Sequence, residues 1–464
     1  MVTTRRSASY KAKAESSKAE KAEEPEVSTE LNPKTTHYEF GGPIGALAME
    51  IFLPLLILFF AVGCDNTGYP SQKLLSMNKD NFLGLFTLQN LAVLIDPMAI
   101  LVYLAFIGWL VVFTFTTNGD KYPGVKLRNG KTLKYECNAI YVLLSLFSIV
   151  VYCGQGPGIK PALWIYDHWV GLNVAAVLFA YAVSFWAYAH SFEPGALLAL
   201  GGNTGNAIYD FMIGRELNPR IDDFDVKFFV ELRPSLMGWL VTNICMGLKQ
   251  YHDLGRITNS MVLVLIFQAW YVIDALWMEP LVLTTMDMTT DGFGFMLAFG
   301  NLCWVPMLYG LQARYLADFP VDLSHTQLFG IVALQLIGYY IFRSANAQKD
   351  KFRRNPKNPK LKHIKFIETK AGTRLMTSGW WGYSRHINYL GDLIMALSWC
   401  LPCGFQSPIP YFYFFYFAFL LWHRQGRDEH KCRTKYGSDW DRYCKKVPYK
   451  IIPGRCYLIA VSTD

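Results

Sequence analysis

The sequence has little charge. Asp, Glu, Lys and Arg make up only 17% of its 464 residues, whereas a soluble domain averages about 25%. Hydrophobic residues account for 52% of the chain and aromatic residues for 16%. This balance excludes an ordinary soluble enzyme and predicts an all-α membrane protein that crosses the bilayer many times.

Several signatures of other protein classes are absent as well. Residues 1–36 are polar, so we expect no cleavable signal peptide and the first apolar segment should act as the signal anchor. The run GGNTG at 201–205 lacks the Gly-Lys-Ser/Thr ending of a phosphate loop, and no Rossmann fingerprint occurs. A nucleotide would therefore need a pocket without those motifs.

The ten cysteines do not have the spacing of a zinc site. Cys400 and Cys403 form a CxxC pattern around Pro402, for which a redox or metal role is the less favoured interpretation. Packing among apolar residues is the simpler one. We therefore predict no metal site.

Apolar stretches are what the sequence has in abundance. A spanning helix needs roughly 20 mostly apolar residues, and a further run near 82–95 suits an interfacial helix better than a span. About ten transmembrane helices are predicted, near 44–63, 98–116, 138–153, 167–190, 227–248, 261–283, 292–316, 326–342, 387–402 and 409–422. The shorter ones must tilt or use flanking aromatic residues.

Basic residues gather in alternate connections between these spans. They are concentrated in the loops 118–137 and 343–386 and in the tail after Trp422, while the opposite loops hold few. The positive-inside rule then predicts that both termini and the basic loops face the cytosol or nucleoplasm.

Residues 1–36 are rich in Lys, Glu, Ala, Ser and Thr, which predicts a disordered tail. The first 13 residues carry only basic charges, and this patch could touch nucleic acid, acidic lipid or a partner. A plain solvated tail is the simpler interpretation. The membrane domain is predicted over residues 37–464.

Polar residues at membrane depth mark candidate sites, because a bilayer rejects them unless they find partners. Gln268, Tyr271 and Asp274 recur every three residues and point broadly one way, with Trp270 and Trp277 nearby. A Tyr–Asp pair in an aromatic cavity suits proton donation to an apolar substrate. A hydrogen bond between helices explains the same residues equally well.

Two further clusters have simpler explanations. Glu231 and Arg233 are two residues apart, so they do not face one another on a helix and each needs another partner. Asp287 and Asp291 lie four apart at the edge of the seventh span, where helix capping is the default expectation.

The C-terminal part carries the strongest candidate binding site. Lys349 and Arg353 share a helix face and could grip a phosphate, and Trp380 and Trp381 offer surface on which a base or nicotinamide could stack. The ninth span begins with Asn388, Tyr389 and Asp392. A stripe spaced by four residues follows the tenth span, consisting of Arg424, Asp428, Cys432 and Tyr436. An amphipathic solvated helix is the alternative for this stripe.

These segments resemble the sterol reductase family. The likeness covers about 37–464 and includes WYVIDALWMEPLVLTTMDMTTDGFGFMLAFG, GWWGYSRHINYLGDLIMALSWCLPCGF and RDEHKCRTKYGSDWDRYCKKVPYKIIPG. Within the family, DGFGFMLAFG and SWCLPCGF are similar to the delta-14-sterol reductase branch, which includes the reductase domain of the lamin B receptor. Ile387 departs from the family, which usually has proline in its RHPNY string.

The resemblance implies a ten-span bundle in the endoplasmic reticulum or inner nuclear membrane, with a sterol entering from the bilayer. It implies NADPH bound at the cytosolic face by the C-terminal half, about 261–464. The residues carried over as cofactor contacts are Lys349, Arg353, Met376, Trp381, Asn388, Tyr389, Arg424, Asp428, Cys432, Tyr436 and Tyr443. The catalytic residues carried over are Tyr271, Asp274 and Asp428.

The predicted activity is NADPH-dependent reduction of the sterol carbon-14 double bond, by proton donation followed by hydride transfer. Three alternatives remain open. The chain could be a nuclear-envelope anchor that binds lamin or chromatin, although its polar tail is short. It could reduce carbon 7 or carbon 24 instead. Its C-terminal quarter is also similar to isoprenylcysteine methyltransferases, although the basic phosphate loop argues against that class.

Overall fold

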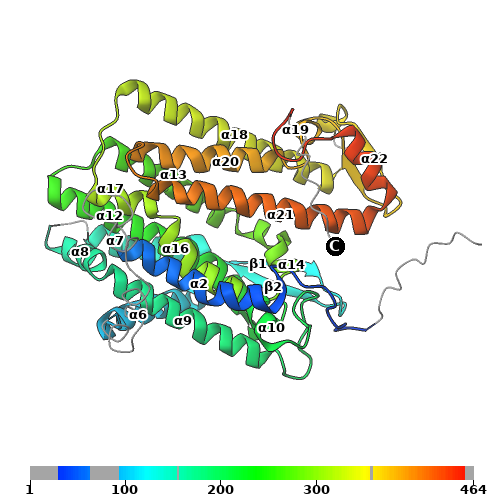
Figure 1. The fold of residues 1–464 in the computed structure, drawn as a ribbon, viewed down its shortest axis with the longest axis horizontal. Coiled ribbons are helices and arrows are strands. Elements are labelled where there is room, and N and C mark those ends of the chain that lie inside the picture. Colours follow the sequence, from blue (N-terminus) through cyan, green and yellow to red (C-terminus); the bar gives the residue numbers. More distant parts are fainter. Residues whose placement is uncertain (1–29, 63–93, 154–155, 356–358, 455–464) are drawn as a thin grey trace, which may run out of the picture.

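The computed structural model describes residues 30–62, 94–153, 156–355 and 359–454, and within these ranges the chain is mostly helical. Its long helices lie side by side along the longest axis of the molecule (Figure 1). They are α2 (Gly42–Val62), α6 (Pro97–Thr116), α7 (Ala139–Cys153), α9 (Trp169–His190), α12 (Gly238–Leu254), α13 (Asn259–Trp277), α18 (His325–Arg354), α20 (Ile387–Cys400) and α21 (Phe412–Tyr436).

Each of the ten predicted apolar stretches coincides with one long helix or with consecutive helical segments. Among the described residues, five helices are long and apolar enough to cross a bilayer by themselves, namely α2, α6, α9, α13 and α18. The protein is therefore membrane-embedded and helical, while the count of ten spans stays a prediction. The predicted tail residues 1–29 and nearly all of the run near 82–95 lie outside the described residues.

Two predicted spans are interrupted by π-helical turns. The first consists of α11 (Val226–Leu232), a π turn at Arg233–Met237 and α12. The second consists of α15 (Phe295–Phe299), a π turn at Gly300–Trp304, α16 (Val305–Leu308) and α17 (Leu311–Asp318). Pro234 lies in the first turn and Pro306 just after the second, and the amide hydrogen that each proline lacks explains why a regular helix breaks there.

Three short hairpins correct the prediction of a purely helical protein. Strand β1 (Asp120–Lys126) pairs with β2 (Thr132–Cys137), β3 (Arg220–Ile221) with β4 (Phe224–Asp225), and β5 (Phe366–Glu368) with β6 (Arg374–Met376), all antiparallel. The first hairpin closes through Asn129-Gly130, with Gly130 at φ +78°. Asn-Gly between two short strands is a strong hairpin signal. This loop was interpreted from the sequence only through its basic charge, and the hairpin was therefore not predicted.

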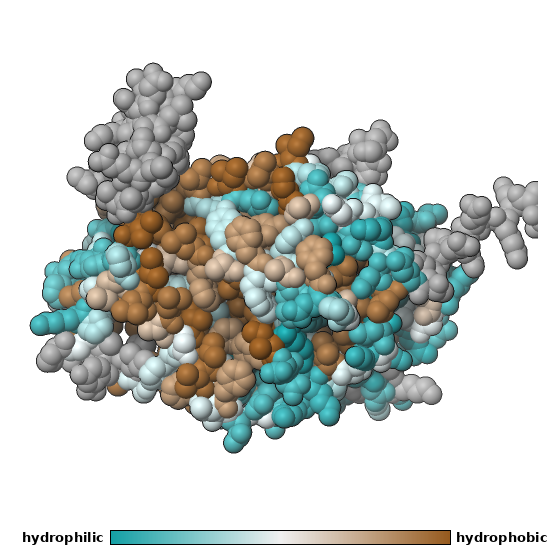
Figure 2. All heavy atoms as spheres, turned by 90° about the horizontal axis from the view of Figure 1, so that it is seen from below, coloured by the Kyte–Doolittle hydropathy of each residue, from teal (hydrophilic) through white to brown (hydrophobic). Residues whose placement is uncertain are grey.

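The surface and the loops agree with a membrane position. Hydrophobic residues dominate the middle of the face shown in Figure 2, and hydrophilic residues lie mainly toward its right end. In Figure 1 the hairpin β1–β2, α14 (Met286–Thr289) and α22 (Ser438–Lys446) gather at one end of the bundle, while α8 (Lys160–Asp167) and α17 lie at the other. The basic loops therefore share one end.

The described part of the chain begins at residue 30, before the predicted end of the tail at residue 36. Asn32 Nδ2 donates to the Ala196 carbonyl at 2.9 Å, and Thr35 Oγ1 donates to the Leu200 carbonyl at 2.6 Å. Residues 32–35 are thus fastened to the loop after α9. The predicted lamin or chromatin contact concerns the residues before them and stays a prediction.

A buried ion pair joins three helical segments near the β1–β2 end. Arg233 is 1% exposed, and its Nη2 lies 2.9 Å from Glu279 Oε1 and donates to Asn138 Oδ1 at 2.6 Å. Glu279 Oε2 accepts the amide of Ala139 at 2.8 Å. Arg233 therefore pairs with Glu279 and not with Glu231, as the spacing predicts, whereas the buried Glu231 Oε2 atom has no hydrogen-bond partner among the described residues.

Replacing Arg233 should destabilise the fold. The change Arg233→Met leaves the Glu279 carboxylate buried without its cation, which should lower the free energy of unfolding by about 3 kcal/mol. Thermal unfolding of detergent-purified protein measures this loss. The matched control is Arg256→Met, because Arg256 pairs with Asp322 at the surface and should change little. Equal midpoints for the two variants would contradict the prediction.

Candidate functional site

The candidate site depends on how closely α18 and α20 pack. Helix α18 begins with a capping box between Ser324 and Gln327 and runs for 30 residues. At the crossing, a Cβ added to Gly391 would lie 2.8 Å from the Gly338 carbonyl oxygen and 2.7 Å from the Phe342 amide nitrogen. No larger residue fits, so the two backbones lie in direct contact and fix the relative positions of the polar residues on both helices.

Lys349 lies near the end of α18 and packs against the side chain of Trp381. Its Nζ is 3.9 Å from the centroid of a Trp381 ring, close enough for a cation–π interaction. Trp381 is held in place because its Nε1 donates to the Ala345 carbonyl at 2.9 Å. Arg353, one turn further, is exposed, and its charge lies within electrostatic range of Lys349.

The first turn of α20 carries Asn388 and Tyr389. The Asn388 Oδ1 atom is buried and has no hydrogen-bond partner among the described residues. Tyr389 stacks on the His386 ring at 5.0 Å, with 22° between the ring planes. Helix α20 begins at Ile387, so the residue that replaces the family's proline leaves the start of this helix intact.

Helix α21 places the predicted stripe on one continuous helix. Arg424, Asp428, Cys432 and Tyr436 all belong to it. Arg424 Nη2 donates to Asp287 Oδ2 at 3.3 Å, whereas Asp428 makes no hydrogen bond or ion pair within the described residues. The charge of Asp428 nevertheless acts on Lys349 of α18 and on Tyr389 of α20.

Met376 and Tyr443 lie in two small apolar clusters beside this stripe. Met376, at the end of β6, packs with Trp381 and Phe352. Tyr443 of α22 is buried against Trp440, with ring centroids 5.1 Å apart, in a cluster that also includes Cys432 and Tyr436. The predicted cofactor residues thus come from α18, β6, α19 (Trp380–Tyr383), α20, α21 and α22.

This arrangement can hold a nucleotide. It offers two cations, a carboxylate without a hydrogen-bond donor among the described residues, several aromatic faces and a buried amide oxygen that likewise lacks a donor there. A ligand with phosphate, ribose hydroxyl and carboxamide groups supplies the complementary partners for these groups. The residues present therefore fit a nicotinamide dinucleotide.

Tyr271 lies in an aromatic cluster deeper in the helical bundle. Its ring centroid is 5.4 Å from that of Trp399 and 5.9 Å from that of Trp239. Tyr413 stacks on Trp399 at 5.6 Å, and Tyr309 packs edge-on against Trp239 at 5.4 Å. Four rings from four other parts of the chain thus gather around one phenol, and such faces stabilise a nearby cation.

The neighbours of Tyr271 differ from those that the sequence suggested. Asp274 directs its carboxylate toward α18, 3.5 Å from Arg343 Nη1 and 3.4 Å from the Tyr339 hydroxyl. Trp270 and Trp277 are 57% and 68% exposed, so they do not line an internal cavity, contrary to the expectation. Period-three spacing identified Tyr271 but could not show which distant rings face it.

Gln268 belongs to a separate buried network. Its Oε1 accepts from Trp239 Nε1 at 3.0 Å and from Asn243 Nδ2 at 2.5 Å. Its Nε2 donates to Gln312 Oε1 at 3.0 Å. This network is the hydrogen bond between helices that was the alternative explanation, and it fixes the Trp239 ring beside Tyr271.

Two acids in the loop 287–291 act differently from the expectation. Asp291 Oδ1 accepts from Arg427 Nη2 at 2.9 Å, and Asp287 binds Arg424. Neither side chain caps α14, whose first residue follows Thr285 without a side-chain cap. The expectation of helix caps was therefore wrong, because both carboxylates pair with arginines of α21.

The sequence placed Asp392 in the candidate C-terminal region but assigned it neither a catalytic nor a cofactor-binding role. It lies one turn after Asn388 and two turns before Trp399 on α20, so the same helix face joins the cofactor residues to the aromatic cluster. Asp392 makes no hydrogen bond or ion pair within the described residues, and its charge acts on Tyr271. The signal for this position was the spacing of the acid from Asn388 and Trp399 within an apolar helix.

Comparison with known proteins fits this geometry. Residues 34–456 match the Ergosterol biosynthesis ERG4/ERG24 family. The chain belongs to this sterol reductase family. The match covers both the aromatic cluster and the C-terminal cofactor residues.

Several relatives resemble this sterol reductase family member over most of its length. It is 48% identical to "Delta(14)-sterol reductase erg24" of Schizosaccharomyces pombe over 90% of this chain and 96% of that protein. It is 44% identical to "Delta(14)-sterol reductase ERG24" of Candida albicans over 92% and 99%. It is 46% identical to "Delta(14)-sterol reductase LBR" of Gallus gallus over 90% of this chain but 64% of that protein.

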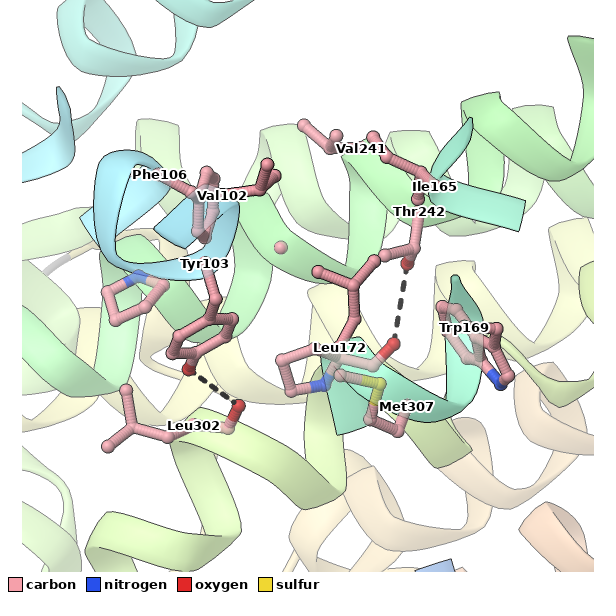
Figure 3. A pocket seen from close by; sticks show the side chains of 13 residues that line it. Val102, Tyr103, Phe106, Ile165, Trp169, Leu172, Val241, Thr242, Leu302 and Met307 are labelled. Atoms are coloured by element: carbon pink, nitrogen blue, oxygen red, sulfur yellow. Dashed lines mark hydrogen bonds between the residues drawn. The ribbon is translucent and has the colours of Figure 1, made fainter. Parts of the chain in front are cut away.

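The sterol reductase also has a small apolar cavity that is lined in part by residues of α12 (Figure 3). Its volume is about 100 Å³, and its lining includes Tyr103, Gly238, Thr242 and Met307. Tyr103 donates its hydroxyl to the Leu302 carbonyl at 3.2 Å, at the second π turn. This cavity carries no charged group among the described residues that line it and is too small for a four-ring sterol.

Lowering the pH should destabilise the protein through His386. Burial, with Lys349, Arg385 and Lys450 nearby, lowers the pKa of His386 to about 3, from an ordinary value of about 6.5. The unfolded chain takes up a proton below pH ~6.5 while the folded chain does not, so the free energy of unfolding falls as the pH drops below that value. At pH ~5 the loss should be about 2 kcal/mol.

Thermal unfolding at the two ends of that pH range measures this loss. The change His386→Gln should reduce the drop in midpoint between neutral pH and pH ~5. The change His252→Gln serves as control because the His252 side chain is 53% exposed. The prediction fails if both variants lose as much stability as the wild type.

Proposed function

We propose that this protein is an NADPH-dependent reductase of the sterol carbon-14 double bond. Relatives named as delta(14)-sterol reductases in several fungi, 42–48% identical over nine-tenths of the chain, carry this assignment. The adjoining nucleotide-compatible groups and aromatic cluster supply the two sites that such a reaction needs.

The chemistry of the substrate sets the order of events. An alkyl-substituted double bond is too electron-rich to accept hydride, so a proton must arrive first and leave positive charge on carbon 14. NADPH, when bound, supplies the hydride that quenches this charge. The protein must therefore provide an acid, exclude water and align the two reactants.

Tyr271 is the proposed proton donor, because its hydroxyl has no hydrogen-bond partner within the described residues and is surrounded by rings. The faces of Trp239 and Trp399 would stabilise the positive charge that protonation creates. Asp274, held by Arg343 and Tyr339, would keep a negative charge near the donor. Asp392 would connect this donor to the cofactor side.

Residues of the C-terminal half would bind the cofactor. Asp428 and Asn388 would contact the ribose or carboxamide, and Trp381 and Tyr389 would offer stacking surface. Lys349 and Arg353 would bind the additional phosphate that distinguishes NADPH from NADH. The residues Met376, Arg424, Cys432, Tyr436 and Tyr443 complete the proposed cofactor site.

The proposed location is the endoplasmic reticulum membrane, continuous with the inner nuclear membrane, with both termini on the cytosolic or nucleoplasmic side. The gathering of the basic loops and the proposed cofactor residues at one end of the bundle supports this orientation. The sterol would enter from the bilayer at the level of the aromatic cluster. Residues 37–464 would form the sterol reductase membrane domain.

The first test is turnover of a delta-8,14 sterol with NADPH by detergent-purified protein, analysed by mass spectrometry. Loss of the 14,15 double bond is expected. The change Tyr271→Phe should lower the rate about 100-fold or more, because it removes the proton donor, yet leave NADPH binding intact. The change Asp428→Asn should weaken NADPH binding.

Matched controls for this test are Tyr251→Phe and Asp322→Asn, both of exposed residues. Activity of Tyr271→Phe at the level of Tyr251→Phe would refute the assigned donor. Turnover of a carbon-7 alkene instead would shift the substrate assignment. A wild-type protein that neither binds NADPH nor reduces any sterol would favour a nuclear-envelope anchor.

A second test concerns the choice of cofactor. The change Arg353→Ala should lower affinity for NADPH about tenfold and leave affinity for NADH nearly unchanged, because only NADPH carries the phosphate that Arg353 would contact. Titration of intrinsic tryptophan fluorescence with each nucleotide measures both affinities. The neighbouring surface variant Arg354→Ala is the control, since Arg354 pairs with Asp350. Parallel losses for both nucleotides would refute this role.

A further inference from the structure

The segment before the first long helix is strained. We call residues 32–41 the N-terminal strap. Phe40 has φ +55° and Gly41 has φ +79°, and a bulky residue rarely adopts the left-handed conformation that Phe40 shows. Such strain persists only where surrounding contacts enforce it, and it gathers at functional sites.

The strap is fastened at its first half to the loop after α9. The amide of Leu198 donates to Asn32 Oδ1 at 2.9 Å, and Asn203 Nδ2 donates to the carbonyls of Asn32 and Pro33 at 3.2 and 3.1 Å. The Thr35 amide also donates to the Asn203 carbonyl at 3.0 Å. These bonds hold the first half of the strap independently of its second half.

The second half of the strap contacts α21 through three side chains. Glu39 Oε1 accepts from Arg427 Nε at 3.1 Å. The Phe40 ring packs on His423, with centroids 4.9 Å apart, and His37 lies nearly parallel to His430 at 6.4 Å. Since the three α21 residues are spaced by four and three, they form one stripe of that helix.

This stripe adjoins the proposed cofactor stripe. Arg427 stands between Arg424 and Asp428 in the sequence, and its guanidinium also binds Asp291 at 2.9 and 3.3 Å. Asp291 is 6% exposed and belongs to the loop whose Asp287 binds Arg424. Glu39 therefore binds Arg427, the same arginine whose ion pair with Asp291 connects this loop to α21.

We propose that Glu39 is a positioning residue for cofactor binding. Through Arg427 it fixes the height and rotation of α21, so that Arg424 and Asp428 face the dinucleotide without first having to reorder. Preorganisation of this kind raises affinity because less freedom is lost on binding. The inference rests on the proposed cofactor site, since the interactions of the strap with α21 reach His423, Arg427 and His430 and not the proposed catalytic residues themselves.

The test uses the full-length protein in detergent. The change Glu39→Gln should raise the Kd for NADPH about fivefold, as expected for loss of one half-buried ion pair, and raise KM for NADPH while kcat stays nearly constant. Amide hydrogen exchange in residues 423–431 should become faster without cofactor. Glu39→Asp, which keeps the charge, should lie between Glu39→Gln and the wild type.

Glu193→Gln is the matched control, because Glu193 is 66% exposed and its partner His190 lies on α9. Equal thermal midpoints for Glu39→Gln and Glu193→Gln would show that general unfolding does not cause the effect. NADPH affinity and hydrogen exchange that match the wild type in Glu39→Gln would overturn the inference. A wild-type protein that does not bind NADPH would instead refute the proposed function, and this inference with it.

Discussion

The direct backbone contact between α18 and α20 is the constraint on which the proposed site depends. Because Gly338 and Gly391 leave no room for a Cβ, the two helices cannot slide without a clash. One helix carries Lys349 and the other carries Asn388, so this contact fixes the spacing between these two residues of the proposed cofactor site. Any side chain at Gly391 would push α18 and α20 apart and so separate Lys349 from Asn388, without changing either polar group.

Ion pairs hold α21, the helix that carries the remaining proposed cofactor residues, in place. Taking an arginine and a carboxylate fully out of water costs several kcal/mol for each ion; the pairs here are only partly buried, so the cost is smaller, and pairing offsets it. Arg424 and Arg427 meet Asp287 and Asp291 at the end of the bundle that carries the basic loops. Arg427 also pairs with Glu39, so a segment remote in sequence contacts the stripe of α21 that adjoins the proposed cofactor residues.

Much of the fold could be read from the sequence, since apolar length locates helices even where prolines break them. The shared face of Arg424, Asp428, Cys432 and Tyr436 could also be predicted, because residues four apart on one helix lie on the same side of it. The neighbours of Tyr271 were not, because Trp239 and Trp399 come from helices far away in the chain. The partners of Asp287 and Asp291 were missed for the same reason, and a local pattern such as capping could not reveal them.

The two halves of the site have opposite physical needs, and α20 reconciles them. A hydride donor needs phosphate and ribose contacts near water, whereas an alkene cation must be kept from water. Asn388 lies at the polar end of α20 and Trp399 is buried within the aromatic cluster, with Asp392 between them. One helix therefore spans the change of environment over three turns. In the proposed reaction, Trp399 and Tyr271 would contact the sterol, and Asn388 at the start of the same helix would contact the cofactor that supplies the hydride.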